Sequence, residues 1–80
     1  MEHPLVTNLD KIHTTELGME RIRKNLSLDN VDVVTWCKQK IKTATDMTRR
    51  GKNWYVRIDD VIVTIHANSF TIITAHRDRR

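Results

Sequence analysis

The chain has 80 residues, which fits one domain near the lower size limit for a self-sufficient hydrophobic core. Hydrophobic residues make up 39% of the chain and charged residues 30%, and the formal net charge is +4. No stretch approaches the roughly 18 apolar residues of a membrane span, so we expect no membrane association. The positive charge favours a polyanionic partner over an acidic protein.

The positive charge is concentrated in the second half of the chain. Residues 1–44 carry seven Lys or Arg and six Asp or Glu, whereas residues 45–80 carry seven and four. Cys37 is the only cysteine, which excludes an internal disulfide and a cysteine-based zinc site. A single cysteine and the absence of an N-terminal apolar run are typical of cytoplasmic proteins, and we expect that location.

Residues 1–11 hold the only proline and show no clear period, so we expect an arm, with a short helical turn over 4–12 as an option. Thr14 and Thr15 both suit the N-cap of a helix. The apolar residues that follow share one helical stripe: Met19, Ile22 and Leu26. Gly18 within this helix costs about 1 kcal/mol relative to alanine. It either allows a chain segment or a ligand to approach closely, or it is simply tolerated.

A second helix is expected after a break at residues 27–30. Asp29 or Asn30 can cap it, and Asp32 then lies in its first turn. Its buried stripe contains Val33 or Val34, followed by Cys37 and Ile41, with Trp36 beside it. We therefore expect Cys37 to be a buried structural thiol.

From Asn53 the hydrophobic period changes to two, which predicts strands. Residues 45–52 before it form a basic connector, with a short strand as an option. Asp59 and Asp60 form a plausible two-residue turn. This turn pairs the apolar residues Ile58 with Val61, Val56 with Val63 and Trp54 with Ile65. On the other face it pairs the polar residues, Tyr55 with Thr64 and Asn53 with His66.

The second hairpin has two possible registers. A two-residue turn at Asn68 and Ser69 places His76 on the apolar face. A three-residue turn that includes Phe70 shifts the parity by one, so that His76 lies opposite Ile62 and Thr74 opposite Thr64. We favour the second register because it keeps His76 out of the apolar layer, and it assigns Ile73 and Ala75 to the core. One face then collects Asn53, Tyr55, Thr64, His66, Thr74 and His76.

The predicted fold class is α+β. Two or three N-terminal helices are expected to pack on one face of a C-terminal antiparallel sheet of three to four strands. No repeat, low-complexity segment or long linker divides the chain, so residues 1–80 are expected to form a single domain. Within it, residues 1–11 are the arm, 12–44 the helical half and 45–80 the sheet half.

The sheet half contains residue types that suit RNA cleavage without a metal. Such cleavage needs a base for the 2′-hydroxyl, a cation for the charge on the phosphoryl oxygens and an acid for the leaving oxygen. Histidine suits the first and third tasks because its unperturbed pKa is about 6.5, and Lys or Arg suits the second. The candidate histidines are His13, His66 and His76. The candidate cations are Lys52, Arg21, Arg23, Arg49, Arg50 and Arg77.

Each of these residues also has a purely structural explanation. A histidine in a sheet is more often a surface or hydrogen-bonded structural residue than a catalyst. Tyr55 can serve only as the cross-strand partner of Thr64, and Thr71 and Thr74 fit strand propensity without any function.

Other site classes find little support in the sequence. No two histidines have metal-ligand spacing on a helix, and no carboxylate obviously joins His66 and His76. With only two glycines there is no glycine-rich phosphate loop, and four aromatic residues do not make a stacking platform. We therefore expect no metal and no cofactor.

Three motifs carry a resemblance to a known family. They are His-Thr-Thr-Glu-Leu-Gly at 13–18 followed by Arg-Ile-Arg-Lys-Asn-Leu at 21–26, Gly-Lys-Asn-Trp-Tyr at 51–55, and Thr-Ile-Ile-Thr-Ala-His at 71–76. In this order, and over residues 8–77, they resemble a small uncharacterised bacterial domain family. The layout of helices followed by an antiparallel sheet is also similar to the barnase, EndoU, colicin D and RelE-like RNases.

The second resemblance implies a metal-independent endoribonuclease of toxin type that acts on tRNA or mRNA, with a cognate inhibitor protein as a further partner. Positions in or beside the motifs would be His13, Thr15, Arg21, Lys52, Asn53, Tyr55, Thr71, Thr74 and His76. His13 and His76 would form the acid and base pair. Lys52 and Arg21 would be the phosphate and transition-state cations. Tyr55 and Thr74 would position the substrate, with Asn53, Thr64, His66 and Thr71 as further binding residues.

Two other functions use the same face of the sheet. The first is a non-catalytic module that binds nucleic acid or a protein partner. The second is a homodimer interface that contains Ile62, Ile72 and Phe70, with the polar residues hydrogen-bonded across a two-fold axis.

Overall fold

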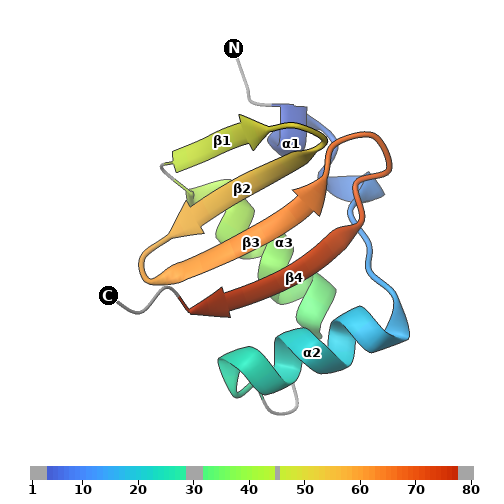
Figure 1. The fold of residues 1–80 in the computed structure, drawn as a ribbon, viewed down its shortest axis with the longest axis vertical. Coiled ribbons are helices and arrows are strands. Elements are labelled where there is room, and N and C mark those ends of the chain that lie inside the picture. The colour runs from blue at the N-terminus through green and yellow to red at the C-terminus, as the bar shows by residue number, and fades with distance from the viewer. Residues whose placement is uncertain (1–3, 29–31, 45, 78–80) are drawn as a thin grey trace.

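A computed structural model describes residues 4–28, 32–44 and 46–77. Helical segments come first in the chain: α1 (Pro4–Thr7), the 3-10 helix η1 (Leu9–Lys11), α2 (Glu16–Leu26) and α3 (Val33–Thr43). They are followed by the strands β1 (Asp46–Arg50), β2 (Asn53–Ile58), β3 (Val61–His66) and β4 (Ile72–Arg77). The strands form one antiparallel sheet in the order β1-β2-β3-β4, which confirms the predicted α+β class (Figure 1).

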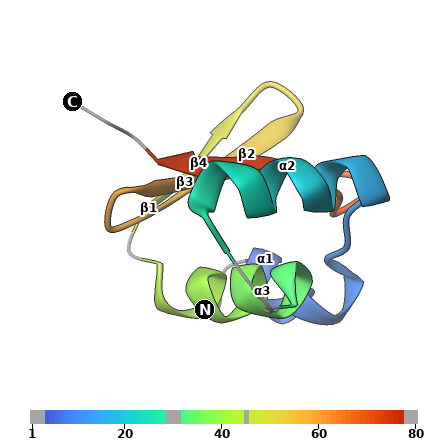
Figure 2. The ribbon, with the colours of Figure 1, turned by 90° about the horizontal axis from the view of Figure 1, so that it is seen from below.

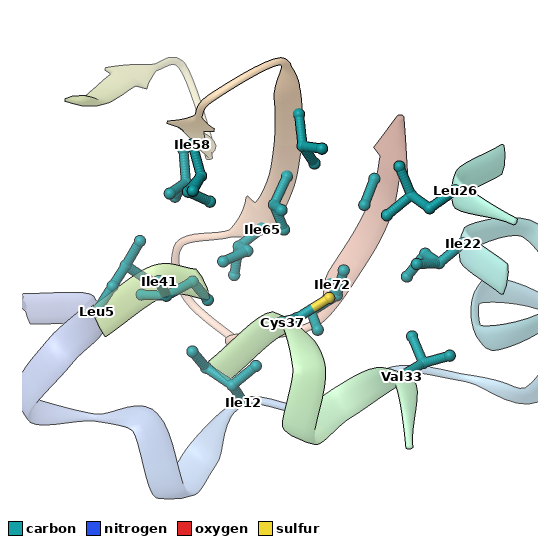
Figure 3. Packing of buried hydrophobic residues seen from close by; sticks show 14 residues of the cluster. Leu5, Ile12, Ile22, Leu26, Val33, Cys37, Ile41, Ile58, Ile65 and Ile72 are labelled. Atoms are coloured by element: carbon teal, nitrogen blue, oxygen red, sulfur yellow. The ribbon is translucent and has the colours of Figure 1, made fainter. Parts of the chain in front are cut away.

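The helices lie to one side of the sheet. Figure 2 shows α1 and α3 together in a layer beneath the strands, with α2 running along β4. The core fills the space between these layers, and Figure 3 shows its side chains converging from both. The buried apolar residues are Leu5, Ile12, Ile22, Leu26, Val33, Cys37, Ile41, Val56, Ile58, Val61, Val63, Ile65, Ile72 and Ala75.

The segment expected to be an arm contributes to this core. Residues 4–11 form α1 and η1, which agrees with the optional helical turn. Leu5 and Ile12 are buried, and both belong to the core cluster. Full burial of such a side chain stabilises a fold by roughly 2 kcal/mol, so in the described residues this segment is part of the folded unit.

The start of α2 is fixed by Thr15, whose side-chain oxygen accepts a hydrogen bond of 3.0 Å from the Gly18 amide. The neighbouring Thr14 hydroxyl donates to the carbonyl of Ile72 in β4 at 2.9 Å. A Cβ atom at Gly18 would overlap the Thr14 hydroxyl. Of the two explanations for Gly18, the structure therefore supports a close approach, which is made by the threonine side chains directly before the helix. The helix ends at Ser27, which adopts a left-handed conformation with φ 54°.

The cap of α3 differs from the sequence prediction. Asp32 is the N-cap, and its carboxylate accepts hydrogen bonds from the amides of Val34 at 3.1 Å and Thr35 at 3.4 Å. Asp29 and Asn30, which were the expected caps, lie outside the described residues. The helix thus begins one residue after Asp32 instead of including it in the first turn.

The first hairpin has the predicted register throughout. Ile58 pairs with Val61, Val56 with Val63 and Trp54 with Ile65, while Tyr55 pairs with Thr64 and Asn53 with His66. The turn residue Asp59 has a positive φ of 54°, a conformation that aspartate tolerates better than most residues. The optional short strand before this hairpin is also present, because β1 pairs with β2 over its whole length.

The second hairpin follows the favoured register only away from its turn. Thr74 pairs with Thr64 and His76 with Ile62, as predicted. Nearer the turn the register shifts by one residue, and Ile65 pairs with Ile72. The prediction that Ile73 enters the core is therefore wrong: Ile73 is 41% exposed, whereas Ile72 is 1% exposed.

The cause of this difference is a β-bulge, which adds one residue to a strand and leaves it unpaired. The turn itself spans residues 67–70, since the His66 amide donates to the Thr71 carbonyl at 2.8 Å. Ile72 also has to be removed from the predicted homodimer interface, because it lies in the core and cannot contribute to an outer patch. Phe70 packs against the core as well, and Ile62 is half-buried.

The β4 edge of the sheet is covered. The amide of Ile72 donates to the His13 carbonyl at 2.7 Å, and the amide of His13 donates to the Phe70 carbonyl at 3.2 Å. Farther along the strand, the Asn25 side chain of α2 donates to the Ala75 carbonyl at 3.3 Å. These bonds occupy backbone groups that an edge strand would otherwise expose to another chain. The described helices include none long and apolar enough to cross a membrane.

Candidate functional site

The face of the sheet opposite α1 and α3 is not covered by any described helix (Figure 2). Because side chains alternate along a strand, this face carries the residues that do not point into the core. Cross-strand pairing arranges most of them in three rows, which we call the His13 row, the Tyr55 row and the His76 row. Together they form the open face.

The three rows follow directly from the register. The His13 row contains Arg50, Asn53, His66, Thr71 and His13. The Tyr55 row contains Thr48, Tyr55, Thr64 and Thr74. The His76 row contains Asp46, Arg57, Ile62 and His76. Since successive rows are two residues apart along β1, β2 and β3, they are separated by roughly 7 Å.

Hydrogen-bond donors and cations gather at the end of the open face that contains the His13 row. Arg50 is exposed there, and no member of the row is an acid. Lys52 lies in the turn between β1 and β2, and its carbonyl accepts a 2.9 Å hydrogen bond from Ala67 in the second hairpin loop. This backbone bond holds the turn that contains Lys52 against the second hairpin loop, and the Lys52 side chain is exposed. The opposite row includes Asp46, which pairs in register with Arg57.

A hollow of about 400 Å³ opens on this face over β1 and β2. Tyr55 is 36% exposed and contributes to its lining. The hollow therefore combines one ring with two guanidinium groups and a carboxylate. The residues that line it are Asp46, Thr48, Arg50, Tyr55, Arg57 and Ile62.

A chain of side-chain hydrogen bonds runs along the end of the His13 row. Nδ1 of His13 lies 2.9 Å from the Lys11 carbonyl, and Nε2 lies 3.0 Å from the Thr71 hydroxyl. That hydroxyl lies 2.8 Å from the hydroxyl of Ser69. Two backbone bonds on either side of Thr71 hold His13 in this position. The two hydroxyls and the imidazole therefore form one connected network.

His66 occupies the neighbouring position on β3. Its Nδ1 accepts hydrogen bonds from the amides of Asn68 at 3.2 Å and Ser69 at 3.4 Å. The ring is thus anchored to the loop that also supplies Ser69. In the neutral ring the proton is then on Nε2, because Nδ1 is an acceptor.

The structure does not bring His13 and His76 together. His13 lies beside Thr71, just before β4, whereas His76 is exposed near the end of that strand. Five residues of extended chain from Thr71 to His76 correspond to roughly 16 Å. A single phosphate cannot contact both imidazoles across this separation. The histidine that lies near His13 is His66, on the other side of Thr71.

The other predicted site residues divide in two groups. Asn53, Tyr55, Thr64, Thr71 and Thr74 all belong to the open face. Thr64 is buried, however, and so contributes little contact surface. Arg21 is exposed on α2, outside the three rows.

Some residues of the open face were not among the predicted site residues. Asp46 and Thr48 reach it through β1, beside Arg50, which was expected only as a candidate cation. Ser69 joins the network through a loop conformation for which the sequence carries no pattern.

Cys37 takes no part in the open face. Its side chain lies in the core, and burial raises the pKa of the thiol from 9.0 to about 12. No group of three His, Cys, Asp or Glu side chains within the described ranges is placed to hold a metal ion.

Comparison with known proteins identifies one family. A model described as a protein of unknown function, DUF3781, matches residues 6–76. No curated protein and no solved structure matches the chain.

Proposed function

Because the chain belongs to the DUF3781 family of proteins of unknown function, we propose its function from the site itself: the open face binds single-stranded RNA. The observation that carries this proposal is the composition of the His13 row. It presents an arginine, an amide, two imidazoles and a hydroxyl side by side, without an acid, and Lys52 lies next to it. Such a surface suits a phosphate backbone.

Each part of the open face has a corresponding part of a nucleotide. Arg50 and Lys52 suit phosphate oxygens, to which they donate charge-assisted hydrogen bonds. Tyr55 offers a ring on which one base stacks, and such stacking does not depend on sequence. The hollow of about 400 Å³ around Tyr55 falls within the usual size range of small-molecule sites, so it suits one nucleotide. The exposed bases and backbone of a single strand fit a flat sheet better than a closed duplex does.

The open face supports RNA binding better than it supports RNA cleavage by His13 and His76, the acid and base pair predicted from the sequence. That cleavage needs an acid and a base at one phosphate, and Thr71, the hydrogen-bond partner of His13, lies roughly 16 Å along the chain from His76. The second candidate function is therefore a toxin-type nuclease that cleaves tRNA or mRNA and binds an inhibitor protein. The 3.0 Å contact between Nε2 of His13 and the Thr71 hydroxyl is the observation that favours this candidate.

The test is a titration of a labelled 12-nucleotide RNA of mixed sequence, followed by fluorescence anisotropy. Arg50→Ala with Lys52→Ala removes two cations from the open face and should weaken binding by roughly tenfold or more. Tyr55→Leu should weaken it by roughly tenfold through the loss of stacking. The control is Lys24→Ala with Lys42→Ala, which removes two exposed lysines from α2 and α3.

The control variant should bind as the wild type does. Equal weakening by both double variants would show that net charge alone drives the association, and the open face would lose its role. The RNA is examined on a denaturing gel after each titration in EDTA. Discrete fragments from the wild-type protein that are absent with His13→Ala would favour the nuclease candidate.

A further inference from the structure

We infer that the Ser69 and His66 end of the open face recognises the ribose 2′-hydroxyl, and so distinguishes RNA from DNA. This inference rests on the proposed function and specifies what the site reads. It depends on the directions of three consecutive hydrogen bonds, which join Ser69 to Thr71, Thr71 to His13, and His13 to the Lys11 carbonyl. The chemistry of these groups determines which one donates in each bond.

The direction is set at the Lys11 carbonyl. A carbonyl oxygen only accepts, so Nδ1 of His13 must carry a proton and donate it across the 2.9 Å contact. In a neutral imidazole the other nitrogen is then an acceptor. The Thr71 hydroxyl, 3.0 Å away, therefore donates to Nε2 of His13.

The same reasoning extends to Ser69. Since the only hydroxyl proton of Thr71 is directed to His13, its oxygen acts as acceptor in the 2.8 Å contact with Ser69. Ser69 donates its proton there, and its oxygen retains free acceptor capacity. Ser69 is exposed, so this acceptor faces solvent at the end of the network.

His66 supplies the complementary donor. Its Nδ1 accepts from the amides of Asn68 and Ser69, so Nε2 carries the proton in the neutral ring. Among the described residues, Nε2 makes no hydrogen bond. The amide of Ser69 lies 3.4 Å from Nδ1, so the imidazole is held against the loop that contains Ser69.

An acceptor on Ser69 and a donor on the imidazole that is held against the same loop suit a hydroxyl group. A ribose 2′-hydroxyl can donate to the Ser69 oxygen and accept from Nε2 of His66. A phosphate oxygen can only accept, and a deoxyribose has no group at this position. Arg50 and Lys52 at the same end of the face suit the adjoining phosphate, so sugar and backbone are contacted together.

The experiment compares three oligonucleotides of identical base sequence: RNA, its 2′-deoxy form with deoxyuridine retained, and its 2′-O-methyl form. The wild-type protein should bind RNA roughly fivefold more tightly than the 2′-deoxy form, the value of one ordinary hydrogen bond. The 2′-O-methyl form should bind as weakly as the 2′-deoxy form, because it cannot donate to Ser69.

Ser69→Ala removes the acceptor, and Thr71→Val breaks the network with a side chain of similar shape. Both variants should reduce the ratio of the affinity for RNA to the affinity for the 2′-deoxy form to nearly one. Thr35→Val on α3 is the matched control and should keep the full preference, since Thr35 is exposed and outside the open face.

The outcomes separate this inference from the proposed function. Equal binding of the RNA and 2′-deoxy forms by the wild-type protein would overturn the inference and leave nucleic-acid binding intact. An unchanged preference in Ser69→Ala would overturn it as well. If the protein bound none of the three oligonucleotides, the proposed function would be overturned, and the inference about Ser69 and His66 would fall with it.

Discussion

At the scale of single residues, Cys37 couples the stability of the core to pH. Burial raises the pKa of its thiol from 9.0 to about 12, so the folded chain retains this proton when the unfolded chain has lost it. The contribution of the thiol to stability is complete below pH 9.0 and decreases as the pH rises towards 12. Between these values the free energy of unfolding should fall by up to about 1.4 kcal/mol per pH unit from this group.

Urea denaturation at pH 8 and pH 10.5 measures this effect. Cys37→Ala is the reference, because it experiences the same change of pH without the thiol. Its free energy of unfolding should change less between the two pH values than that of the wild type. An identical change in both proteins would show that the buried thiol does not carry the effect.

Gly18 provides a second prediction at this scale. Alanine is favoured over glycine in a helix by about 1 kcal/mol, yet a Cβ atom here would overlap the Thr14 hydroxyl. We expect Gly18→Ala to destabilise the fold by roughly 1 to 2 kcal/mol, the usual cost of overpacking. The measurement is the urea midpoint.

A double-mutant cycle with Thr14→Ala isolates the cause. Removal of the hydroxyl opens the space, so Gly18→Ala should be less destabilising in that background. If the two substitutions were simply additive, contact with Thr14 would not explain the glycine.

At the scale of elements, the predictability of each hairpin depended on its pattern. Residues 53–58 alternate between polar and apolar side chains, and residues 61–66 do so except at Ile62. A shift by one residue would expose most of the apolar set, so one register suits the sequence best. In β4 the adjacent Ile72 and Ile73 both suit the core by composition. Nothing in that pair indicates which one is buried, and the bulge decides it.

The candidate site was predictable only in part for a related reason. Asn53, Tyr55 and His66 are placed on one face by local alternation. The contact between His13 and Thr71 instead joins residues 58 positions apart through an isolated parallel bridge. Such a contact depends on how α2 packs against β4, which no local pattern encodes.

The N-cap of α3 gives a prediction at the same scale. The Asp32 carboxylate satisfies two amides of the first turn. Asp32→Ala should therefore lower the free energy of unfolding by about 1 kcal/mol, and Asp32→Asn should retain most of it. Chemical denaturation of the three proteins checks this. Equal losses in Ala and Asn would indicate that the charge at the helix end matters more than the capping bond.

At the scale of the whole molecule, one side of the sheet is used for stability and the other is left available. The helices bury the apolar face, and the β4 edge is blocked by α2 and by the backbone of His13. The positive excess of residues 45–80 lies in the half of the chain that forms the open face. This separation lets the polar rows change without loss of the core, since they share few buried side chains with it.

The same distribution predicts how binding responds to salt. If the open face neutralises about three phosphates of a single strand, the logarithm of affinity should fall with the logarithm of salt concentration with a slope of roughly −2. Between 50 and 200 mM salt this corresponds to a loss of roughly 15-fold. Anisotropy titrations of the RNA at four salt concentrations measure the slope. Arg50→Ala should make it less steep by roughly 0.7, because one phosphate contact is lost. A slope near zero for the wild type would instead indicate an interface without phosphate contacts, as expected if the open face bound a protein partner.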